Sequence, residues 1–223
     1  MDLELKGKTA LVTGAGSAIG EAVARRLVHE GAAVLLVDES DRVADELAAA
    51  LREAGGEVMS GTTGQGVDVL LAAAAGWRGG VQLAWLGDMA GASSLAEAIG
   101  SLDAVADHLA ALGGGSIVMQ STTAASWDVP GASAEYAAMG AAVLQLARQA
   151  GARRAGDGVR VNAVCPGGID DPRDGRVIDQ AAVPLAGPGS AADVADVAAF
   201  LLSPRADYTT GQAIVIDGGA SVI

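Results

Sequence analysis

Glycines and one acidic residue near the start of the chain have the spacing that a dinucleotide site requires. The segment TGAGSAIG, residues 13–20, joins an apolar run to a helical pattern, and its glycines let the backbone approach a pyrophosphate. The N-terminus of the following helix offers free N–H groups and a positive dipole end. Asp38 ends the next apolar run, eighteen residues after Gly20. This pattern indicates a site for phosphate and ribose groups.

Asp38 also indicates which dinucleotide would bind. A carboxylate accepts hydrogen bonds from the adenosine ribose 2′-OH and repels a 2′-phosphate, so the spacing favours NAD over NADP. A second interpretation stays open, because the fold needs a turn at this point whatever binds there. On that interpretation Gly14, Gly16 and Gly20 only make a tight turn, and Asp38 caps a helix.

The surrounding elements follow from an alternation of short β-branched runs with longer Ala- and Leu-rich segments, which predicts a parallel sheet with helices on both faces. We expect one α/β domain over residues 1–223, a Rossmann-like, doubly wound parallel sheet of about seven strands flanked by helices. TALVTG and AAVLLVDES are the first two strands, and later strands are expected at 57–60, 81–86, 116–120, 160–165 and 213–217. Later helices are expected at 94–112, 133–155 and 191–202, the last opened by a capping box of Ser190 and Asp193.

Composition disfavours several kinds of partner. The net charge of −13 repels phosphate backbones and anionic lipid, so we expect neither a nucleic-acid nor a membrane-surface partner. Apolar runs such as LLAAAA and VQLAWL are too short to cross a bilayer. Cys165 is the only cysteine and MDLELKGK has no signal-peptide core, so we expect a cytoplasmic protein without an internal disulfide. We name no metal site.

Four landmarks carry a resemblance to a known family. TGAGSAIG, Tyr136, VRVNAVCPGG and TTGQAIVIDGGA resemble, in order and spacing, those of the short-chain dehydrogenases/reductases, over essentially the whole chain. The resemblance implies NAD as the cofactor, if one is bound, and a dimer or tetramer whose contacts come largely from the C-terminal elements. The cofactor-binding residues that it implies are Gly14, Gly16, Ser17, Ile19, Gly20, Asp38, Gly91, Pro166 and Gly167.

The resemblance makes Tyr136 the residue that exchanges a proton with the substrate oxygen. In the family a lysine four residues later lowers the tyrosine pKa and holds the nicotinamide ribose, but this chain has Gly140 there. A phenol with a pKa of about 10 is a poor base at neutral pH without such a cation. The only lysines, Lys6 and Lys8, precede the first strand, and Arg148 lies roughly 18 Å along the same helix. We expect no cation to replace the missing lysine.

The remaining catalytic residues of the family are also altered. The hydroxyl that positions the substrate carbonyl falls, by its spacing from Tyr136, on Thr122 or Thr123. These threonines could instead satisfy backbone groups where a strand ends. The only asparagine, Asn162, lies in the strand before CPGG, where we expect a structural role, so the catalytic asparagine of the family is absent.

Several cofactor contacts depart from the family pattern as well. Ala18 replaces the middle glycine of the turn and adds a methyl group where the phosphate passes. The family's Asn-Asn-Ala-Gly appears as DMAG at 88–91, and SGTTGQG lacks the aspartate that contacts adenine. Asp171 stands where the family has a threonine near the nicotinamide amide.

Two segments beside the expected pocket are shorter than in the family. Only twenty-one residues separate Gly91 from GGGSIV, which is room for one helix but not for the family's extra loop and helix. The polar segment IDDPRDGRVIDQAA stands where the family has a helical substrate lid. Because a reaction needs an oriented substrate and excluded water, we expect a pocket with one wall missing.

Three functions are consistent with this pattern. The sequence favours a degenerate, non-catalytic subunit that assembles with an active, lysine-bearing paralogue, for example as a heterotetramer, in an NAD-dependent alcohol or hydroxyacyl dehydrogenase. The second is an active NAD(H)-dependent dehydrogenase or ketoreductase with an atypical Tyr-Thr site. The third is a non-redox lyase on the same fold that uses Tyr136 for acid–base work. The substrate is not encoded in any motif.

Overall fold

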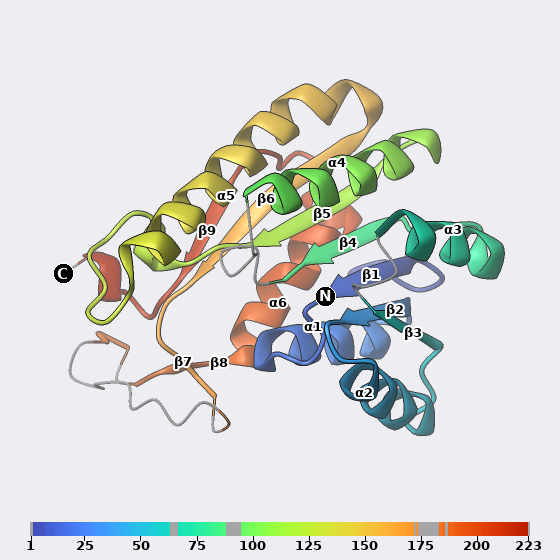
Figure 1. Ribbon diagram of the computed structural model, residues 1–223, viewed down its shortest axis with the longest axis horizontal. Helices are drawn as coiled ribbons and strands as arrows, with labels where there is room; N and C mark the ends of the chain where they lie inside the picture. Colours follow the sequence, from blue (N-terminus) through green and yellow to red (C-terminus); the bar gives the residue numbers. More distant parts are fainter. Residues whose placement is uncertain are drawn as a thin grey trace.

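A computed structural model describes residues 2–62, 67–87, 95–171, 173, 183–185 and 187–222. Its main sheet has seven parallel strands in the order β3-β2-β1-β4-β5-β6-β9 (Figure 1). These strands are β1 (Thr9–Thr13), β2 (Ala33–Asp38), β3 (Val58–Thr62), β4 (Leu83–Leu86), β5 (Gly115–Gln120), β6 (Val159–Pro166) and β9 (Ala213–Ile216). The chain winds from β1 toward one edge and then from β4 toward the other, so the strand order reverses between β1 and β4.

Helices cover both faces of the sheet (Figure 1). One layer holds α1 (Ala18–His29), α2 (Asp41–Glu53) and α6 (Ala191–Leu202), and the other holds α3 (Val67–Arg78), α4 (Leu95–Ala111) and α5 (Ala134–Arg154). Successive strand residues serve opposite layers: Val12 packs into the core beneath α1 and α6, and Leu11 into the core beneath α4 and α5. Burial on both faces explains why the strands are almost continuously apolar.

Short elements complete the described part of the chain. Two further strands, β7 (Ile169–Asp170) and β8 (Gly189–Ser190), form a separate parallel pair. The 3₁₀ helices are η3 (Thr123–Ala125), η4 (Ala155–Asp157), η6 (Pro204–Ala206) and η7 (Ala220–Val222). The β7–β8 pair brings the segment after β6 next to the start of α6.

The expected fold class is confirmed, with seven parallel strands between two helical layers. Helices α4, α5 and α6 begin and end within one residue of the sequence expectation, although residue 94 lies outside the described residues. The sequence interpretation missed α3, whose alanine run was considered only as a membrane span. It also missed the β7–β8 pair, because two-residue strands are too short to show a period.

The expected capping box at the start of α6 is confirmed. The N–H of Asp193 donates to Ser190 Oγ at 3.3 Å, and the N–H of Ser190 donates to Asp193 Oδ2 at 2.7 Å. Hydrogen bonds from the backbone and side chain of Ser190 lower the pKa of the Asp193 carboxyl. This cap fixes where α6 begins, and α6 packs directly against α1, the helix after the glycine turn.

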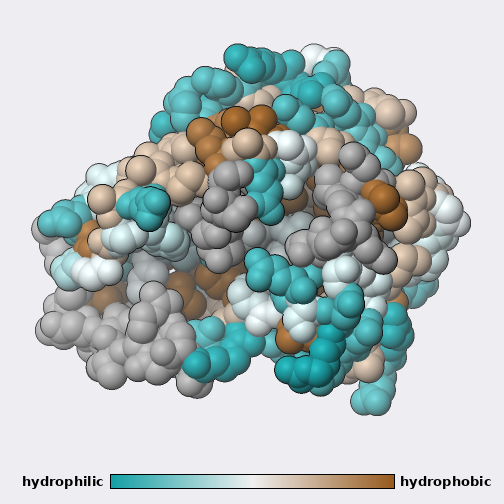
Figure 2. Space-filling model, viewed as in Figure 1, coloured by the Kyte–Doolittle hydropathy of each residue, from teal (hydrophilic) through white to brown (hydrophobic). Residues whose placement is uncertain are grey.

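The surface differs in character between its helices. Figure 2 shows hydrophilic residues over α2 and apolar residues between α4 and α5.

Among the residues that the structure describes, no helix is long and apolar enough to cross a membrane. No three His, Cys, Asp or Glu side chains in the same ranges lie together as a metal site would need.

Candidate functional site

The carboxyl ends of the parallel strands bring most of the expected site residues to one edge of the sheet. The glycine turn follows β1, Asp38 ends β2, the threonines follow β5, and Pro166 ends β6. Proteins of this topology bind ligands in the crevice at the carboxyl ends of the strands, where the strand order reverses. Gly91, also expected at the site, lies outside the described residues.

The turn after β1 requires its glycines for reasons of space. Gly14 has a φ of +62°, a conformation that side chains other than glycine rarely adopt. A Cβ on Gly20 would fall 2.1 Å from the carbonyl oxygen of Gly14, and a Cβ on Gly16 would fall 2.5 Å from Cγ1 of Val43 on α2. The turn is therefore tightly packed in its own right, as the second interpretation of the sequence expected.

Ser17 organises the N-terminus of α1. Its Oγ accepts a hydrogen bond from the N–H of Gly20 at 3.0 Å, and its hydroxyl donates to the carbonyl of Gly14 at 2.8 Å. The N–H groups of Ala18 and Ile19 belong to the first helical turn and have no acceptor within the helix. A ready place for an anion therefore exists at the start of α1, where the helix dipole is positive.

Asp38 holds the glycine turn from the neighbouring strand. Its Oδ2 accepts a hydrogen bond from the N–H of Gly16 at 2.8 Å, and its Oδ1 accepts one from the N–H of Ser40 at 3.2 Å. The expectation that Asp38 could cap a helix is wrong in detail, because both donors lie outside α2, which starts at Asp41. An ionised carboxylate has about four acceptor positions, so Asp38 keeps acceptor capacity for a ribose hydroxyl.

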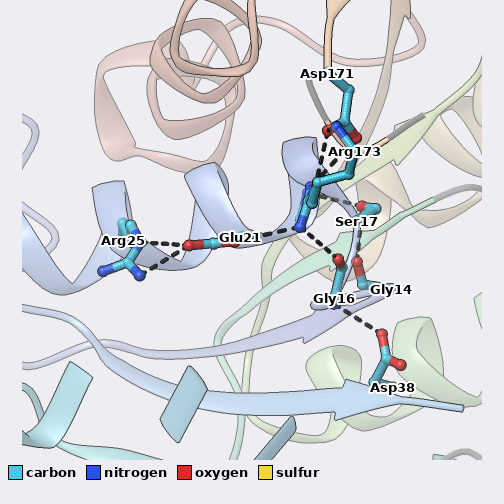
Figure 3. A network of polar contacts seen from close by, with 9 residues as sticks. Gly14, Gly16, Ser17, Glu21, Arg25, Asp38, Asp171 and Arg173 are labelled. Carbon is cyan, nitrogen blue, oxygen red and sulfur yellow. Dashed lines mark hydrogen bonds and ion pairs between the residues drawn. The ribbon is translucent and has the colours of Figure 1, made fainter. Parts of the chain in front are cut away.

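The structure adds Arg173 to the site (Figure 3). The Arg173 guanidinium donates to the carbonyl of Gly16 at 3.0 Å and forms a bidentate contact with Asp171 at 2.9 and 3.3 Å. Its Nη1 lies 3.5 Å from a carboxylate oxygen of Glu21, which also pairs with Arg25 at 2.8 Å. The hydrogen bond to Asp171 is the main cause that raises the pKa of Arg173.

Sequence reasoning identified Asp171 as an acidic departure from the family but missed its partner. Arg173 lies in a polar segment without a period, and its contact with Gly16 spans 157 positions. The one available signal was the Asp-x-Arg spacing, which is common in loops.

A shallow groove of about 400 Å³ borders this network. It is lined by α1 residues such as Ala18 and Ala22 and by Asp170 and Ala191.

Tyr136 stands at the third position of α5, close to the helix N-terminus. Its N–H donates to the Oγ of Ser133, the N-cap residue, at 3.1 Å, and its side chain is half-buried. The 3₁₀ helix η3 packs against α5, and it carries Thr123 and is capped by Thr122. The three expected catalytic residues thus belong to two elements in contact.

The two threonines have different surroundings. Thr122 Oγ1 accepts a hydrogen bond from the N–H of Ala124 at 3.2 Å and so caps η3, as the structural interpretation of these hydroxyls expected. The methyl group of Thr123 lies 3.7 Å from the position that a Cβ on Gly167 would take, toward the end of β6. Both threonines are more than nine-tenths buried.

The position of the missing lysine is closed. A Cβ on Gly140 would lie 2.7 Å from Cγ2 of Thr122 and 3.1 Å from the Cβ of Ala125. The hydroxyl of Ser121 also donates to the carbonyl of Gly140 at 2.9 Å. Glycine at this position therefore allows α5 to approach η3 closely, and a lysine would require the two elements to separate.

The segment that ends β6 has a tight structural role. A Cβ on Gly167 would lie 2.6 Å from the Cβ of Asp217, and the N–H of Gly167 donates to the carbonyl of Ile216 at 2.9 Å.

The expected structural role of Asn162 is confirmed. Its Nδ2 donates to the carbonyl of Thr209 at 2.9 Å, and its Oδ1 accepts from the N–H of Gln212 at 3.0 Å. Asn162 is fully buried in β6.

The two lysines lie where the sequence placed them. The carbonyl of Lys8 accepts a hydrogen bond from the N–H of Ala33, the first residue of β2. Side-chain and backbone atoms of Lys6 lie within 3.4 Å of the Cβ position of Gly31, just before β2. Both lysines are therefore at the amino ends of the strands, at the edge opposite Asp38 and Tyr136.

The fold is a doubly wound α/β fold, and the site has the features that such a fold uses to bind a dinucleotide. Its glycine turn leaves no room for side chains at Gly16 and Gly20, its first helix presents unpaired N–H groups, and an acidic residue ends β2. These features fit a dinucleotide: the turn and helix suit the pyrophosphate, and Asp38 suits a ribose hydroxyl.

Comparison with known proteins assigns the family. A short chain dehydrogenase model matches residues 8–80, and an enoyl-(acyl carrier protein) reductase model matches residues 63–221. The chain is 32% identical to 2-(S)-hydroxypropyl-CoM dehydrogenase 3 of Xanthobacter autotrophicus, with all of both chains covered. The chain belongs to the short-chain dehydrogenase/reductase family.

Solved structures show the same fold. A short-chain dehydrogenase/reductase from Burkholderia xenovorans is 31% identical, covers 98% of each chain and gives a TM-score of 0.89. A 7α-hydroxysteroid dehydrogenase complexed with NADH and 7-oxo glycochenodeoxycholic acid is 25% identical, covers 98% of this chain and 96% of its own, and gives a TM-score of 0.86. The fold, the family assignment and the similarity to a structure that contains NADH therefore all indicate the same class of oxidoreductase.

The comparison with the Xanthobacter relative also bears on length. The alignment runs over 276 positions although this chain has 223 residues, so the relative carries segments that have no counterpart here. The sequence expectation that two segments beside the pocket are shortened stays a prediction, because the alignment length does not say where the missing segments lie. The relatives named above are dehydrogenases, which favours an active dehydrogenase over the non-catalytic subunit that the sequence placed first.

Proposed function

We propose that this protein is an NAD(H)-dependent oxidoreductase that interconverts an alcohol and a carbonyl compound at an atypical Tyr-Thr site. The observation that carries the proposal is the Asp38 carboxylate, held across the glycine turn by the N–H of Gly16 at 2.8 Å. Family membership and relatives named as dehydrogenases of hydroxylated compounds support the same reaction class. We further propose that residues 1–223 form one domain and that the protein is cytoplasmic, as the sequence predicts.

The cofactor preference follows from charge. Asp38 fixed at the end of β2 accepts a hydrogen bond from a ribose 2′-OH and repels a 2′-phosphate, so NAD(H) is favoured over NADP(H). Ala18 adds only a methyl group at the first position of α1 and leaves the first-turn N–H groups available to the pyrophosphate. The nicotinamide, when bound, supplies the hydride acceptor or donor.

The chemistry assigned to the side chains is proton transfer and positioning. In the oxidation direction the Tyr136 oxygen takes the hydroxyl proton of the substrate, and a threonine hydroxyl donates to the substrate oxygen. Of the two threonines, Thr122 has its Oγ1 occupied as a cap acceptor but keeps its O–H proton to donate.

Binding and turnover test this proposal separately. Calorimetric titration should show NAD⁺ binding to the wild type, weakened by Asp38→Asn, and NADP⁺ binding should be weaker than NAD⁺ binding. Turnover of a panel of secondary alcohols with NAD⁺, lost in Tyr136→Phe at unchanged NAD⁺ affinity, supports catalysis by this chain. Substrate conversion without any change in NADH absorbance would instead support a lyase. The absence of NAD⁺ binding would contradict the proposed function.

A second candidate function is favoured by the closed position at Gly140. A Cβ at position 140 would lie 2.7 Å from Cγ2 of Thr122. The packing of α5 against η3 therefore requires a glycine where the family has its lysine. This supports the non-catalytic subunit that the sequence placed first. A groove between α4 and α5, lined by Ile99 and Leu146 and by charged residues such as Arg153, offers contact area for a homodimer or a paralogue.

Expression with and without a lysine-bearing paralogue distinguishes the two candidates. An inactive purified chain that co-purifies with such a paralogue and raises its activity supports the subunit function. An isolated chain whose NAD⁺-dependent activity depends on Tyr136 supports the first proposal. The heteromeric partner itself is not specified by any described contact.

A further inference from the structure

Arg173 lies against the glycine turn, although it follows the turn by 157 positions in the sequence (Figure 3). Its Nη1 donates to the carbonyl of Gly16 at 3.0 Å, and two of its nitrogens contact Asp171 at 2.9 and 3.3 Å. The same Nη1 lies 3.5 Å from Glu21 on the first turn of α1. A guanidinium group therefore stands beside the helix N-terminus that faces the crevice.

We propose that Arg173 binds the pyrophosphate of the dinucleotide and supplies positive charge beside the glycine turn. The inference rests on the proposed NAD(H) site and names the side chain that recognises the charged part of the cofactor. Its position beside Gly16 puts it at the same turn as the first-turn N–H groups of Ala18 and Ile19. Those groups have no acceptor within the helix and suit phosphate oxygens.

The charges around the turn explain why a cation is needed. Glu21, Asp38 and Asp171 surround it with carboxylates, and the whole chain carries a net charge of −13. A pyrophosphate that entered this acidic surrounding would be repelled. Arg25 does not perform the same task, because it pairs with Glu21 from the side away from Gly16 (Figure 3).

The present contacts of Arg173 leave it free to change partners. Its side chain is 49% exposed, and ion pairs in such positions are weak because water screens them. A guanidinium presents a planar fork of donors that matches phosphate oxygens bidentately. Arg173 can therefore exchange Glu21 for a phosphate while Asp171 continues to hold the other side of the fork.

Equilibrium binding with three probes tests this assignment. NADH is titrated by nicotinamide fluorescence, and ADP and adenosine by calorimetry, with wild type, Arg173→Gln and the control Arg25→Gln. Arg25→Gln removes one positive charge from the same network without touching the turn. Arg173→Gln should weaken NADH and ADP binding by about ten-fold or more, or about 1.4 kcal/mol, and leave adenosine binding unchanged. Arg25→Gln should change all three by about two-fold or less.

Two further measurements make the result specific. Added NaCl should weaken ADP binding more in the wild type than in Arg173→Gln, because the variant lacks the charge that salt screens. Glu21→Gln, which removes the carboxylate that competes for Arg173, should strengthen ADP binding. Thermal melting of each variant establishes that it is folded before any binding value is compared.

The outcomes separate this inference from the proposed function. If the wild type binds NADH and Arg173→Gln behaves like Arg25→Gln, the assignment of Arg173 is overturned while the NAD(H) site stands. If equal losses occur for adenosine and ADP, Arg173 acts on the fold of the turn and the assignment is also overturned. If the folded wild type binds neither NADH nor ADP, the proposed function fails first.

Discussion

The hydroxyl of Ser121, just after β5, donates a hydrogen bond of 2.9 Å to the carbonyl of Gly140 on α5. This contact fixes the helix against the end of the sheet at the position where the family places its lysine. The same close approach puts Thr122 Cγ2 only 2.7 Å from where a Cβ on Gly140 would stand. Restoring a side chain there is therefore expected to disturb the fold before it changes the chemistry.

The first prediction compares two glycines in helices. Gly140→Ala should lower the free energy of unfolding, because overpacking of about 1–3 kcal/mol exceeds the helix-propensity gain of about 1 kcal/mol. Gly100→Ala, in α4, meets nothing within 4 Å and should raise the free energy of unfolding by up to about 1 kcal/mol. Urea denaturation of both variants checks the opposite signs.

A double variant identifies the cause. Thr122→Ser removes the methyl group that a Cβ on Gly140 would meet, so Gly140→Ala should cost less in that background. Additive effects in the two backgrounds would show that Thr122 is not the limiting contact. Gly140→Lys in the same background then tests whether a cation beside Tyr136 raises the rate of alcohol oxidation.

Local spacing explains what the sequence could predict about the site. The glycine turn and Asp38 were identified because both lie within forty residues of the N-terminus, at the ends of strands that show clear apolar patterns. The hydrogen bond from Gly16 to Asp38 then follows from the parallel pairing of β1 and β2. Strands that pair side by side make such contacts predictable.

Contacts between distant, irregular segments could not be predicted in the same way. Arg173 reaches Gly16 from a polar loop whose path no period specifies. The closed space at Gly140 depends on the orientation of the Thr122 methyl group and on the separation of α5 and η3. Sequence alone reports that a lysine is missing, whereas packing determines that the position has no room for one.

The second prediction concerns Arg160, a partly buried residue of β6. Its guanidinium donates to the carbonyls of Leu201 at 2.8 Å and Ser203 at 2.9 Å, at the C-terminal end of α6. Arg160→Met should lower the free energy of unfolding by about 2–4 kcal/mol, because these carbonyls lose a charged donor. Asp207→Asn is the matched control, since Asp207 is exposed and 3.8 Å from the guanidinium, and it should change stability by about 0.5 kcal/mol or less. Equal losses in both variants would contradict this assignment.

The third prediction concerns the thiol of Cys165. Burial raises its pKa to about 11, and the opposing effect of Arg148 is smaller. The native protein should therefore not react with a disulfide reagent such as DTNB at pH 8, whereas urea-unfolded chains should release one equivalent of chromophore. Rapid labelling of the native protein would show that the strand β6 opens locally.

The fourth prediction concerns His108 on α4, whose Nε2 accepts a hydrogen bond of 3.0 Å from the N–H of Val81. Burial lowers the pKa of this imidazole below the ordinary histidine value of about 6.5. The folded state therefore binds fewer protons than the unfolded state, and the contribution of His108 to stability is complete above about pH 6.5. It is lost as the pH falls through the lowered folded-state pKa.

His108→Gln, which keeps an acceptor but does not titrate, isolates this contribution. The free energy of unfolding, measured by urea denaturation between about pH 5 and 8, should fall more on acidification in the wild type than in the variant. His29→Gln serves as the control, because His29 is the only other histidine. An unchanged pH dependence in His108→Gln would mean that protonated His108 keeps its place against β4, and that Val81 finds another acceptor.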